Sequence, residues 1–167
     1  MAAADRQSLI DAYERGAELA NEAIRGLGNE ELNRMPPPDA GPEAGKWSIQ
    51  QVVVHLADAE LAFADRIKRI AAEDDPVLQA WDENRFVQRL AYDAQSAQYA
   101  AIMIALTRKQ VTAILRSLPD AAFARTGRHS ERGPQTILDV LGYAVPHLER
   151  HLNFVRAKRK LMGRPAA

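Results

Sequence analysis

Apolar residues recur at steps of three and four along four long stretches of the chain, a periodicity that predicts four amphipathic helices. The first stretch runs from about residue 5 to 26, and the second begins at Ser48 and ends before Asp74. The third covers about 93 to 118, and the fourth runs from 135 or 136 to 162. Prolines and glycines gather between these stretches, where they disfavour helix. On the third stretch the large apolar residues are expected to face inward: Tyr99, Ile102, Met103 and Leu106.

Composition supports an all-α fold. The chain has 30 alanines among 167 residues, whereas valine, isoleucine and threonine together number 22. Alanine favours helices and β-branched residues favour strands. We therefore predict an antiparallel four-helix bundle that forms one domain over residues 1–167, with a short extra connector between the second and third long helices. The connector, 77–90, carries Trp81 and Phe86 and has room for a short helix.

Charge and residue usage exclude several classes of protein. Lys+Arg and Asp+Glu both number 22, so a nucleic-acid binder is not expected. No apolar run approaches the length of a membrane span, and no signal peptide opens the chain, which predicts a cytoplasmic protein without membrane contact. The chain has no cysteine, which excludes disulfides, thiolate zinc sites and a cysteine nucleophile. A bundle of this size is also compatible with a homodimer.

Three of the four histidines could act together. His147 and His151 are four residues apart, which places both rings on one face of the last predicted helix. His55 lies at the edge of the apolar stripe of the second helix, and such edge positions point into the seams between packed helices. A three-histidine metal site is therefore feasible, although half-buried, hydrogen-bonded histidines explain the same spacing. The H-E-x-x-H and Glu-x-x-His metal motifs are absent, as are phosphate-binding glycine loops and the G-x-S-x-G elbow.

Two motifs resemble the DinB-like superfamily. The run from Lys46 to Glu60 is similar to its W-[ST]-x-x-[EQ]-[VIL]-x-x-H-[LI]-x-[DE] signature, with Trp47, Ser48, Gln51, His55 and Asp58 in place. The last helix, with Thr136-Ile137-Leu138 before His147, His151, Leu152 and Arg156, resembles the family's H-x-x-x-H-[LI] pattern. The resemblance covers nearly the whole chain in helix order. It implies a four-helix bundle that holds a divalent metal through His55, His147 and His151.

The resemblance also leaves points of difference and open roles. Pro146 directly precedes His147 and predicts a kink that would move both histidines of that helix relative to His55. Tyr143 matches no role known for the family. Three neutral imidazoles leave a coordination position open, as in catalytic sites. Zinc or nickel suits imidazole best, and iron or manganese is also compatible.

Other residues have weaker claims. Asp58 and Tyr143 are secondary catalytic candidates: Asp58 as an acceptor for an imidazole N–H, as a base, or simply as an ion-pair partner of Arg66. Gln51 is expected to cap Ser48 or to line the pocket, and Trp47 to pack at the bundle end. His129 is expected to be solvated in a loop. The charged run 156–160 is expected to complement the helix dipole without a ligand.

Three functions follow as hypotheses. The first is a metal-dependent enzyme acting on a small molecule, either a transferase that uses an external low-molecular-weight thiol or a hydrolase that uses metal-bound water. The second is a non-catalytic, stress-type metal-binding protein that dimerises through an exposed apolar helix face. The third is a structural bundle whose histidines belong to the core. The sequence does not identify the substrate.

Overall fold

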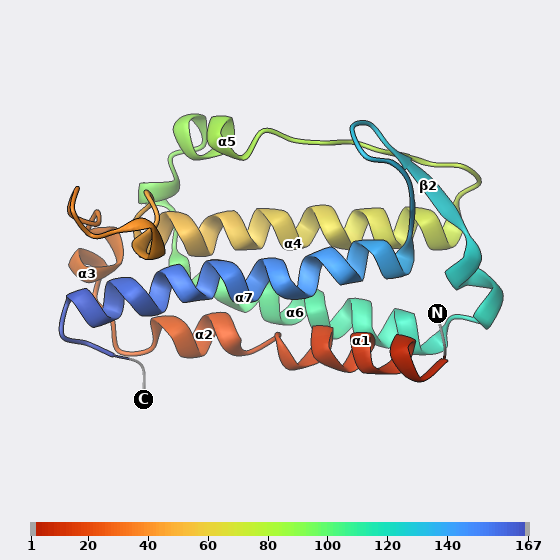
Figure 1. Cartoon of the computed structure of the whole chain (residues 1–167), viewed down its shortest axis with the longest axis horizontal. Helices are drawn as coiled ribbons and strands as arrows, with labels where there is room; N and C mark the ends of the chain where they lie inside the picture. The colour runs from red at the N-terminus through yellow and green to blue at the C-terminus, as the bar shows by residue number, and fades with distance from the viewer. Residues whose placement is uncertain (1–2, 166–167) are drawn as a thin grey trace.

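The chain folds as a four-helix bundle (Figure 1). The computed structural model describes residues 3–165, so the ends of the predicted domain, 1–2 and 166–167, lie outside the described part. Three sides of the bundle are single long helices, and the fourth consists of two helices in succession. These elements are α4 (Ile49–Ala72), α6 (Ala97–Ser117), α7 (Ile137–Leu161) and the pair α1 (Ala3–Arg15) and α2 (Leu19–Ile24). The predicted all-α class and bundle architecture are confirmed.

The helix directions differ from the prediction of a fully antiparallel bundle. Gln50, at the start of α4, donates a hydrogen bond to the carbonyl of Gln95, just before α6. Farther along both helices, Arg108 Nε lies 2.6 Å from Glu60 Oε2. The two helices therefore run parallel, and the chain between them must return along the bundle, as Figure 1 shows. The helices α4 and α7 are antiparallel, as predicted.

Side-chain caps explain where two long helices begin. Ser48 Oγ accepts a hydrogen bond from the amide of Gln51, and the Gln51 side chain accepts one from the amide of Ser48. Thr136 and Asp139 form the same reciprocal arrangement at the start of α7. Each pair satisfies two backbone donors that a helix start leaves free. Gln51 is therefore a capping residue, one of the two roles expected for it.

The first predicted helix is interrupted between α1 and α2. Arg108 of α6 is 1% exposed, and its Nη1 donates a hydrogen bond of 3.1 Å to the carbonyl of Tyr13. A Cβ on Gly16 would lie 2.0 Å from that Nη1 atom. The guanidinium therefore occupies the space beside the chain where a regular helix with side chains would continue. This contact joins residues 95 positions apart, so local periodicity does not report it.

The inward face of α6 is not the one predicted. Tyr99, Ile102, Met103 and Leu106 are exposed by 77%, 47%, 37% and 63%. Four of the nine buried positions of this helix are alanines, all in its first half: Ala97, Ala100, Ala101 and Ala105. The others are Ile104, Arg108, Val111, Thr112 and Leu115. Small side chains let α6 approach α4 closely. The large apolar residues form an exposed stripe on α6, defined by those first four residues.

A small sheet and several short helices complete the fold. The strand β1 (Val77–Leu78) pairs in parallel with β2 (Thr126–His129), which pairs antiparallel with β3 (Gly133–Thr136). The all-α prediction missed this sheet because its strands have two to four residues. In Figure 1 the connector and the β2–β3 hairpin pass over α4. The short helices are α3 (Asn29–Asn33), α5 (Glu83–Arg89), η1 (Pro42–Ala44), η2 (Tyr92–Ala94) and η3 (Asp120–Ala124). The helix α5 confirms the short helix expected in the connector.

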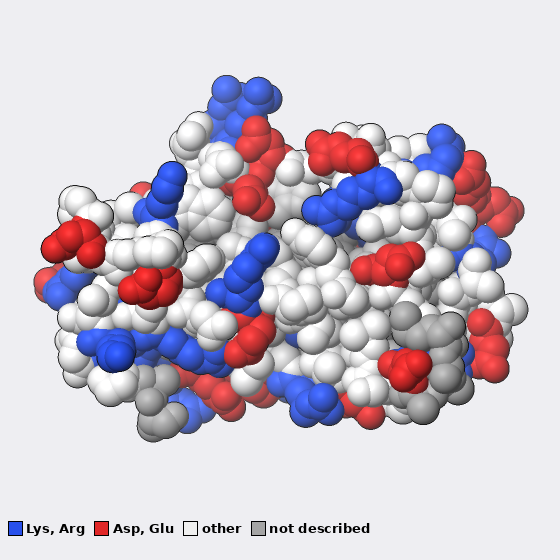
Figure 2. Space-filling view, viewed as in Figure 1, with Lys and Arg blue, Asp and Glu red and all other residues white. Residues whose placement is uncertain are grey.

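On the face that Figure 2 shows, basic and acidic side chains alternate, so no large area carries charge of a single sign. Within residues 3–165, no helix combines the length and the apolar character needed to cross a bilayer.

Candidate metal centre

Three histidine side chains meet between α4 and α7. His55 comes from α4, and His147 and His151 come from successive turns of α7. Each offers one nitrogen, and these three nitrogens all lie within 4.8 Å of one another. The ring centroids are 5.3 Å apart for His55 and His147, 4.7 Å for His55 and His151, and 4.5 Å for His147 and His151. We refer to these residues as the three-histidine cluster.

Pro146 does not end α7, which runs without interruption from Ile137 to Leu161. The proline and Gly142, whose carbonyl loses its usual N–H partner there, are both exposed. Water can therefore satisfy that carbonyl, which removes much of the cost of a proline in a helix. His147 and His151 still converge on His55, so the displacement expected from Pro146 does not separate them.

Burial keeps the cluster uncharged. His55, His147 and His151 are 0%, 6% and 8% exposed. Burial lowers the pKa of His55 to about 3, of His147 to about 2 and of His151 to about 4. Burial is the largest cause, and neighbouring histidines and the charge of Arg150 contribute to the lowered pKa of His55 and His147. Each imidazole is then neutral at pH 7 and keeps a lone pair that a cation can use.

The hydrogen bonding of the cluster fits a cation. Both nitrogens of His55 and Nδ1 of His151 are buried and have no hydrogen-bond partner among the described residues. A buried polar atom without a partner costs free energy, so a core histidine is normally paired. This observation counts against histidines that serve only the core. A divalent ion held by one nitrogen from each ring matches the donor set and the spacing.

Aromatic rings wall the cluster on several sides. The ring of Trp47 lies 5.0 Å from that of His55 and is stacked on His151 at 6.3 Å. Trp81, from the connector, lies 5.6 Å from His55. Trp47 is thus part of the site wall as well as a packing residue, which the sequence did not predict. Apolar walls of this kind restrict water and strengthen electrostatic interactions inside.

Two cavities reach the cluster, one at His55 and His147 and the other at His151. The first, of about 70 Å³, is lined by His55 and His147 together with Arg66, Arg132 and Glu131; we call it the Arg66 cavity. The second, of about 220 Å³, is lined by His151, Trp47, Phe154 and Lys158, among others; we call it the Lys158 cavity. The cluster therefore has access to a polar chamber on one side and a largely apolar one on the other.

His129 is not solvated as predicted. It lies in β2, is 5% exposed and faces the Arg66 cavity. Its Nδ1 accepts a hydrogen bond of 3.2 Å from the amide of Glu131. Burial and the charges of Arg66 and Arg132 lower its pKa. Its burial depends on the sheet, which the sequence analysis missed.

The charged run 156–160 is also only partly at the surface. Lys158 and Arg159 are 3% and 6% exposed. Arg159 donates hydrogen bonds to the carbonyls of Ala23 and Arg25, where α2 ends. The dipole interpretation stays a prediction for the exposed Lys160, whereas Arg156 pairs with Glu149, Arg159 caps a second helix and Lys158 lines a cavity.

The secondary catalytic candidates lie in different places. Asp58 is half-buried and accepts a hydrogen bond from the hydroxyl of Tyr92, so neither an imidazole nor Arg66 is its partner. Arg66 donates instead to the carbonyl of Gln79, at 2.8 Å. The Tyr143 ring stacks on His147 at 5.5 Å and lies under the guanidinium of Arg132, so Tyr143 borders the Arg66 cavity.

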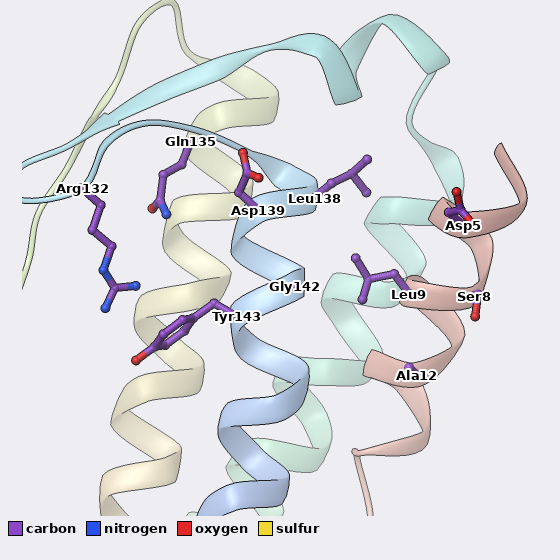
Figure 3. Close-up of a pocket in the computed structure, with 10 residues that line it drawn as sticks. All are labelled: Asp5, Ser8, Leu9, Ala12, Arg132, Gln135, Leu138, Asp139, Gly142 and Tyr143. Atoms are coloured by element: carbon purple, nitrogen blue, oxygen red, sulfur yellow. The ribbon is translucent and has the colours of Figure 1, made fainter. Parts of the chain in front are cut away.

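A third hollow lies outside the cluster. It is an open groove of about 840 Å³ between α1 and the first turns of α7. Figure 3 shows Leu9 and Ala12 on one side and Tyr143 with Arg132 on the other, with Gly142 between them. None of the three clustered histidines lines it, so the chemistry of the site belongs to the two cavities described above.

Comparisons with known proteins agree with this architecture. The family model of the DinB superfamily matches residues 12–155. A protein of Oceanobacillus iheyensis named "Putative metal-dependent hydrolase" is 28% identical over 153 residues, covering 90% of this chain and 85% of its own. The similarly named YfiT of Bacillus subtilis is 27% identical over 120 residues, covering 71% of this chain and 67% of its own.

A solved structure extends the comparison to the fold. It is described as YfiT from Bacillus subtilis, "a probable metal-dependent hydrolase with an unusual four-helix bundle topology". The TM-score is 0.85 at 22% sequence identity, over 98% of this chain and 90% of that one. With the family model matched over most of its length, the chain belongs to the DinB superfamily.

Proposed function

We propose that the protein is a metal-dependent enzyme that acts on a small molecule, with His55, His147 and His151 as the ligands of one divalent cation. The observation that carries the proposal is the convergence of three neutral imidazoles, each of which offers one nitrogen within 4.8 Å of the other two. Both ring nitrogens of His55 are buried without a hydrogen-bond partner among the described residues. Zinc or nickel is the preferred ion for such ligands, and iron or manganese is compatible.

The donor set favours catalysis over a structural role. Three neutral ligands leave the charge of a divalent ion uncompensated and one position open to a substrate or solvent molecule. When bound, the ion supplies Lewis acidity that lowers the pKa of a coordinated water or thiol. The protein contributes the orientation of the three rings, the aromatic walls of Trp47 and Trp81 that restrict water, and two cavities for the rest of the substrate.

Hydrolysis is the reaction we favour, because the named relatives carry that activity in their names. Transfer of a low-molecular-weight thiol to a small electrophile is the second reaction that the same site supports. The chain has no cysteine, so that thiol would have to come from outside. Tyr143, at the border of the Arg66 cavity, is the residue best placed to contact a substrate beside His147.

The metal site is tested by elemental analysis of purified protein, comparing wild type with His55→Ala and His147→Ala. We expect near-stoichiometric metal in wild type and its loss in both variants, with helical circular dichroism retained. His129→Ala is a matched control, since it removes a buried histidine outside the cluster and should keep the metal. Wild-type protein that takes up none of zinc, nickel, iron and manganese at neutral pH would refute the proposal.

The reaction is tested with the metal-loaded protein. Activated esters and amides report hydrolysis, and an electrophile such as chlorodinitrobenzene offered with a small thiol reports transfer. We expect turnover that disappears on chelation and in His147→Ala. Turnover that requires both metal and thiol would select the transferase reaction.

One observation favours a second candidate, a non-catalytic metal-binding dimer. The exposed stripe on α6 spaces four large apolar side chains at positions i, i+3, i+4 and i+7, which suits packing against the same stripe of a second copy. Sedimentation velocity of wild type and Leu106→Lys tests this. A wild-type dimer that the variant dissociates, together with metal binding and no turnover across esters and thiols, would favour the second candidate.

A further inference from the structure

Lys158 is a buried cation without an acidic partner. Its side chain is 3% exposed, and among residues 3–165 no carboxylate lies within ion-pairing distance of it. Its Nζ donates one hydrogen bond, of 3.3 Å, to the carbonyl of Phe154 on the preceding turn of α7. An ammonium group has three hydrogens, so donor capacity remains. Its Nζ also lies over the ring of Phe154, 5.7 Å from the centroid. Most buried lysines are paired with a carboxylate, and this one has only a carbonyl and a ring, so an anionic ligand would complete its surroundings.

The Lys158 cavity is built for a small anion with an apolar part. Its walls include Trp47 and Phe154, and its charged lining residues are Lys46 and Lys158, with no acidic residue among them. Its volume of about 220 Å³ corresponds to roughly seven water-sized groups, since each water occupies about 30 Å³ in the liquid. A short carboxylic acid has that size, an anionic carboxylate and an apolar chain.

The cavity also reaches the three-histidine cluster. His151 lines it, and Trp47 stacks on His151 while forming a wall of the cavity. The two residues His151 and Lys158 lie on one helix, seven positions apart, which places them two turns apart on the same face. A molecule that fills the cavity therefore extends from Lys158 toward the cluster.

We infer that the Lys158 cavity binds a carboxylate of the substrate, with the Lys158 ammonium as its partner and the apolar part of the substrate between Trp47 and Phe154. The inference rests on the proposed function in one respect: the other end of the bound substrate reaches the three-histidine cluster, where the proposed reaction takes place. It names the substrate class as small molecules that carry a carboxylate a few carbon atoms from the reacting group. The carboxylate site itself needs no metal.

The test uses metal-free protein and a matched pair of probes, pentanoate and pentanamide, which have the same number of heavy atoms and differ in charge. Trp81→Phe leaves Trp47 as the single tryptophan, so fluorescence reports the cavity directly. We expect pentanoate to bind on the order of tenfold or more tightly than pentanamide at pH 7, because hydrogen bonds to charged groups are the stronger ones.

Lys158→Met separates the inference from a general effect of charge. We expect this variant to bind both probes equally, whereas Lys46→Met, which removes an exposed lysine at the same cavity, keeps most of the preference. Circular dichroism controls for folding, and methionine at a buried position is tolerated. Equal binding of the two probes to wild type, no binding of either, or a preference that persists in Lys158→Met would overturn the inference.

The result is independent of the proposed enzyme function. If the metal-free protein prefers the carboxylate but the protein binds no metal, the cavity assignment stands and the proposed enzyme function is refuted. If turnover depends on metal but the protein shows no preference for carboxylates, the enzyme function stands and the cavity assignment is refuted.

Discussion

Residues of the three-histidine cluster couple the stability of the metal-free protein to pH. An unfolded histidine has a pKa near 6.5, and in the folded protein the values fall to about 3, 2 and 4. Below pH 6.5 the unfolded chain takes up protons that the folded protein does not, so stability is full above that pH and is lost as the pH falls. At pH 5.5, one unit below the pKa of an unfolded histidine, each of the three residues lowers the free energy of unfolding by up to about 1.36 kcal/mol, or about 4 kcal/mol in total.

Urea unfolding of chelator-treated protein at pH 8 and pH 5.5 measures this loss. In His147→Leu the difference between the two pH values should shrink by about a third, because one of the three groups is gone. His129, whose pKa is also lowered, adds a smaller loss of its own that His129→Gln removes. Equal unfolding free energies at both pH values would contradict the neutral, buried state of the cluster.

A second residue-scale prediction concerns the buried pair Glu60 and Arg108, which are 2% and 1% exposed and 2.6 Å apart. Glu60→Leu should destabilise the fold by about 3–5 kcal/mol, because it leaves the guanidinium buried without its carboxylate. Glu60→Leu combined with Arg108→Met should recover most of that loss. The exposed pair Glu30–Arg34 is the control, and Glu30→Leu should change stability by less than about 1 kcal/mol. A double variant as unstable as the single one would show that Arg108 is needed for more than its charge.

Single residues differ in how far the sequence predicted them. The three clustered histidines were predicted, because the His147–His151 spacing and the position of His55 on its stripe are local features of two helices. Lys158 was missed, because its burial depends on Phe154 and on the loop before α4, which cover it. Periodicity identifies the face of a helix but not what lies over that face.

At the scale of elements, two glycines, one in the turn between α1 and α2 and one inside α7, should respond oppositely to alanine. A Cβ on Gly16 would lie 2.0 Å from Arg108 Nη1 and 2.9 Å from Leu148 Cδ2, whereas a Cβ on Gly142 would meet nothing within 4 Å. We expect Gly16→Ala to destabilise by about 1–3 kcal/mol through overpacking. Gly142→Ala, inside α7, should stabilise by about 0.5–1 kcal/mol. Thermal and urea unfolding measure both, and a stable Gly16→Ala would mean that Arg108 does not cause the break between α1 and α2.

Elements were predicted well where their cause is local. The cap of α4 and the ends of α4, α6 and α7 follow from residues within a few positions. The Thr136–Asp139 cap of α7 is equally local, although it was not predicted. The inward face of α6 was wrong, because a helix rich in alanine offers two apolar faces and the larger side chains lie on the one that α4 does not cover. The sheet was missed because its strands are short and because β1 pairs with β2, which lies about 50 residues later.

The topology of the whole molecule explains how the site is closed. Because α4 and α6 run parallel, the connector has to return over the bundle, and this path brings Trp81 to within 5.6 Å of His55. The long connection is thus also a wall of the candidate centre. A fully antiparallel bundle, as the sequence suggested, would need no connection that returns along the bundle and would leave that side of the cluster open.

Metal removal should therefore weaken the molecule as a whole, because the cluster joins α4 to α7 between the two main parts of the core. A ligand that binds the folded protein alone adds about 2.7 kcal/mol to stability at one hundred times its dissociation constant. Zinc at that excess should raise the melting temperature of wild type and of His129→Gln alike, and chelation should reverse the rise. His55→Ala and His147→Ala should not respond to zinc. A rise that is retained in both of these variants would place the bound metal elsewhere in the molecule.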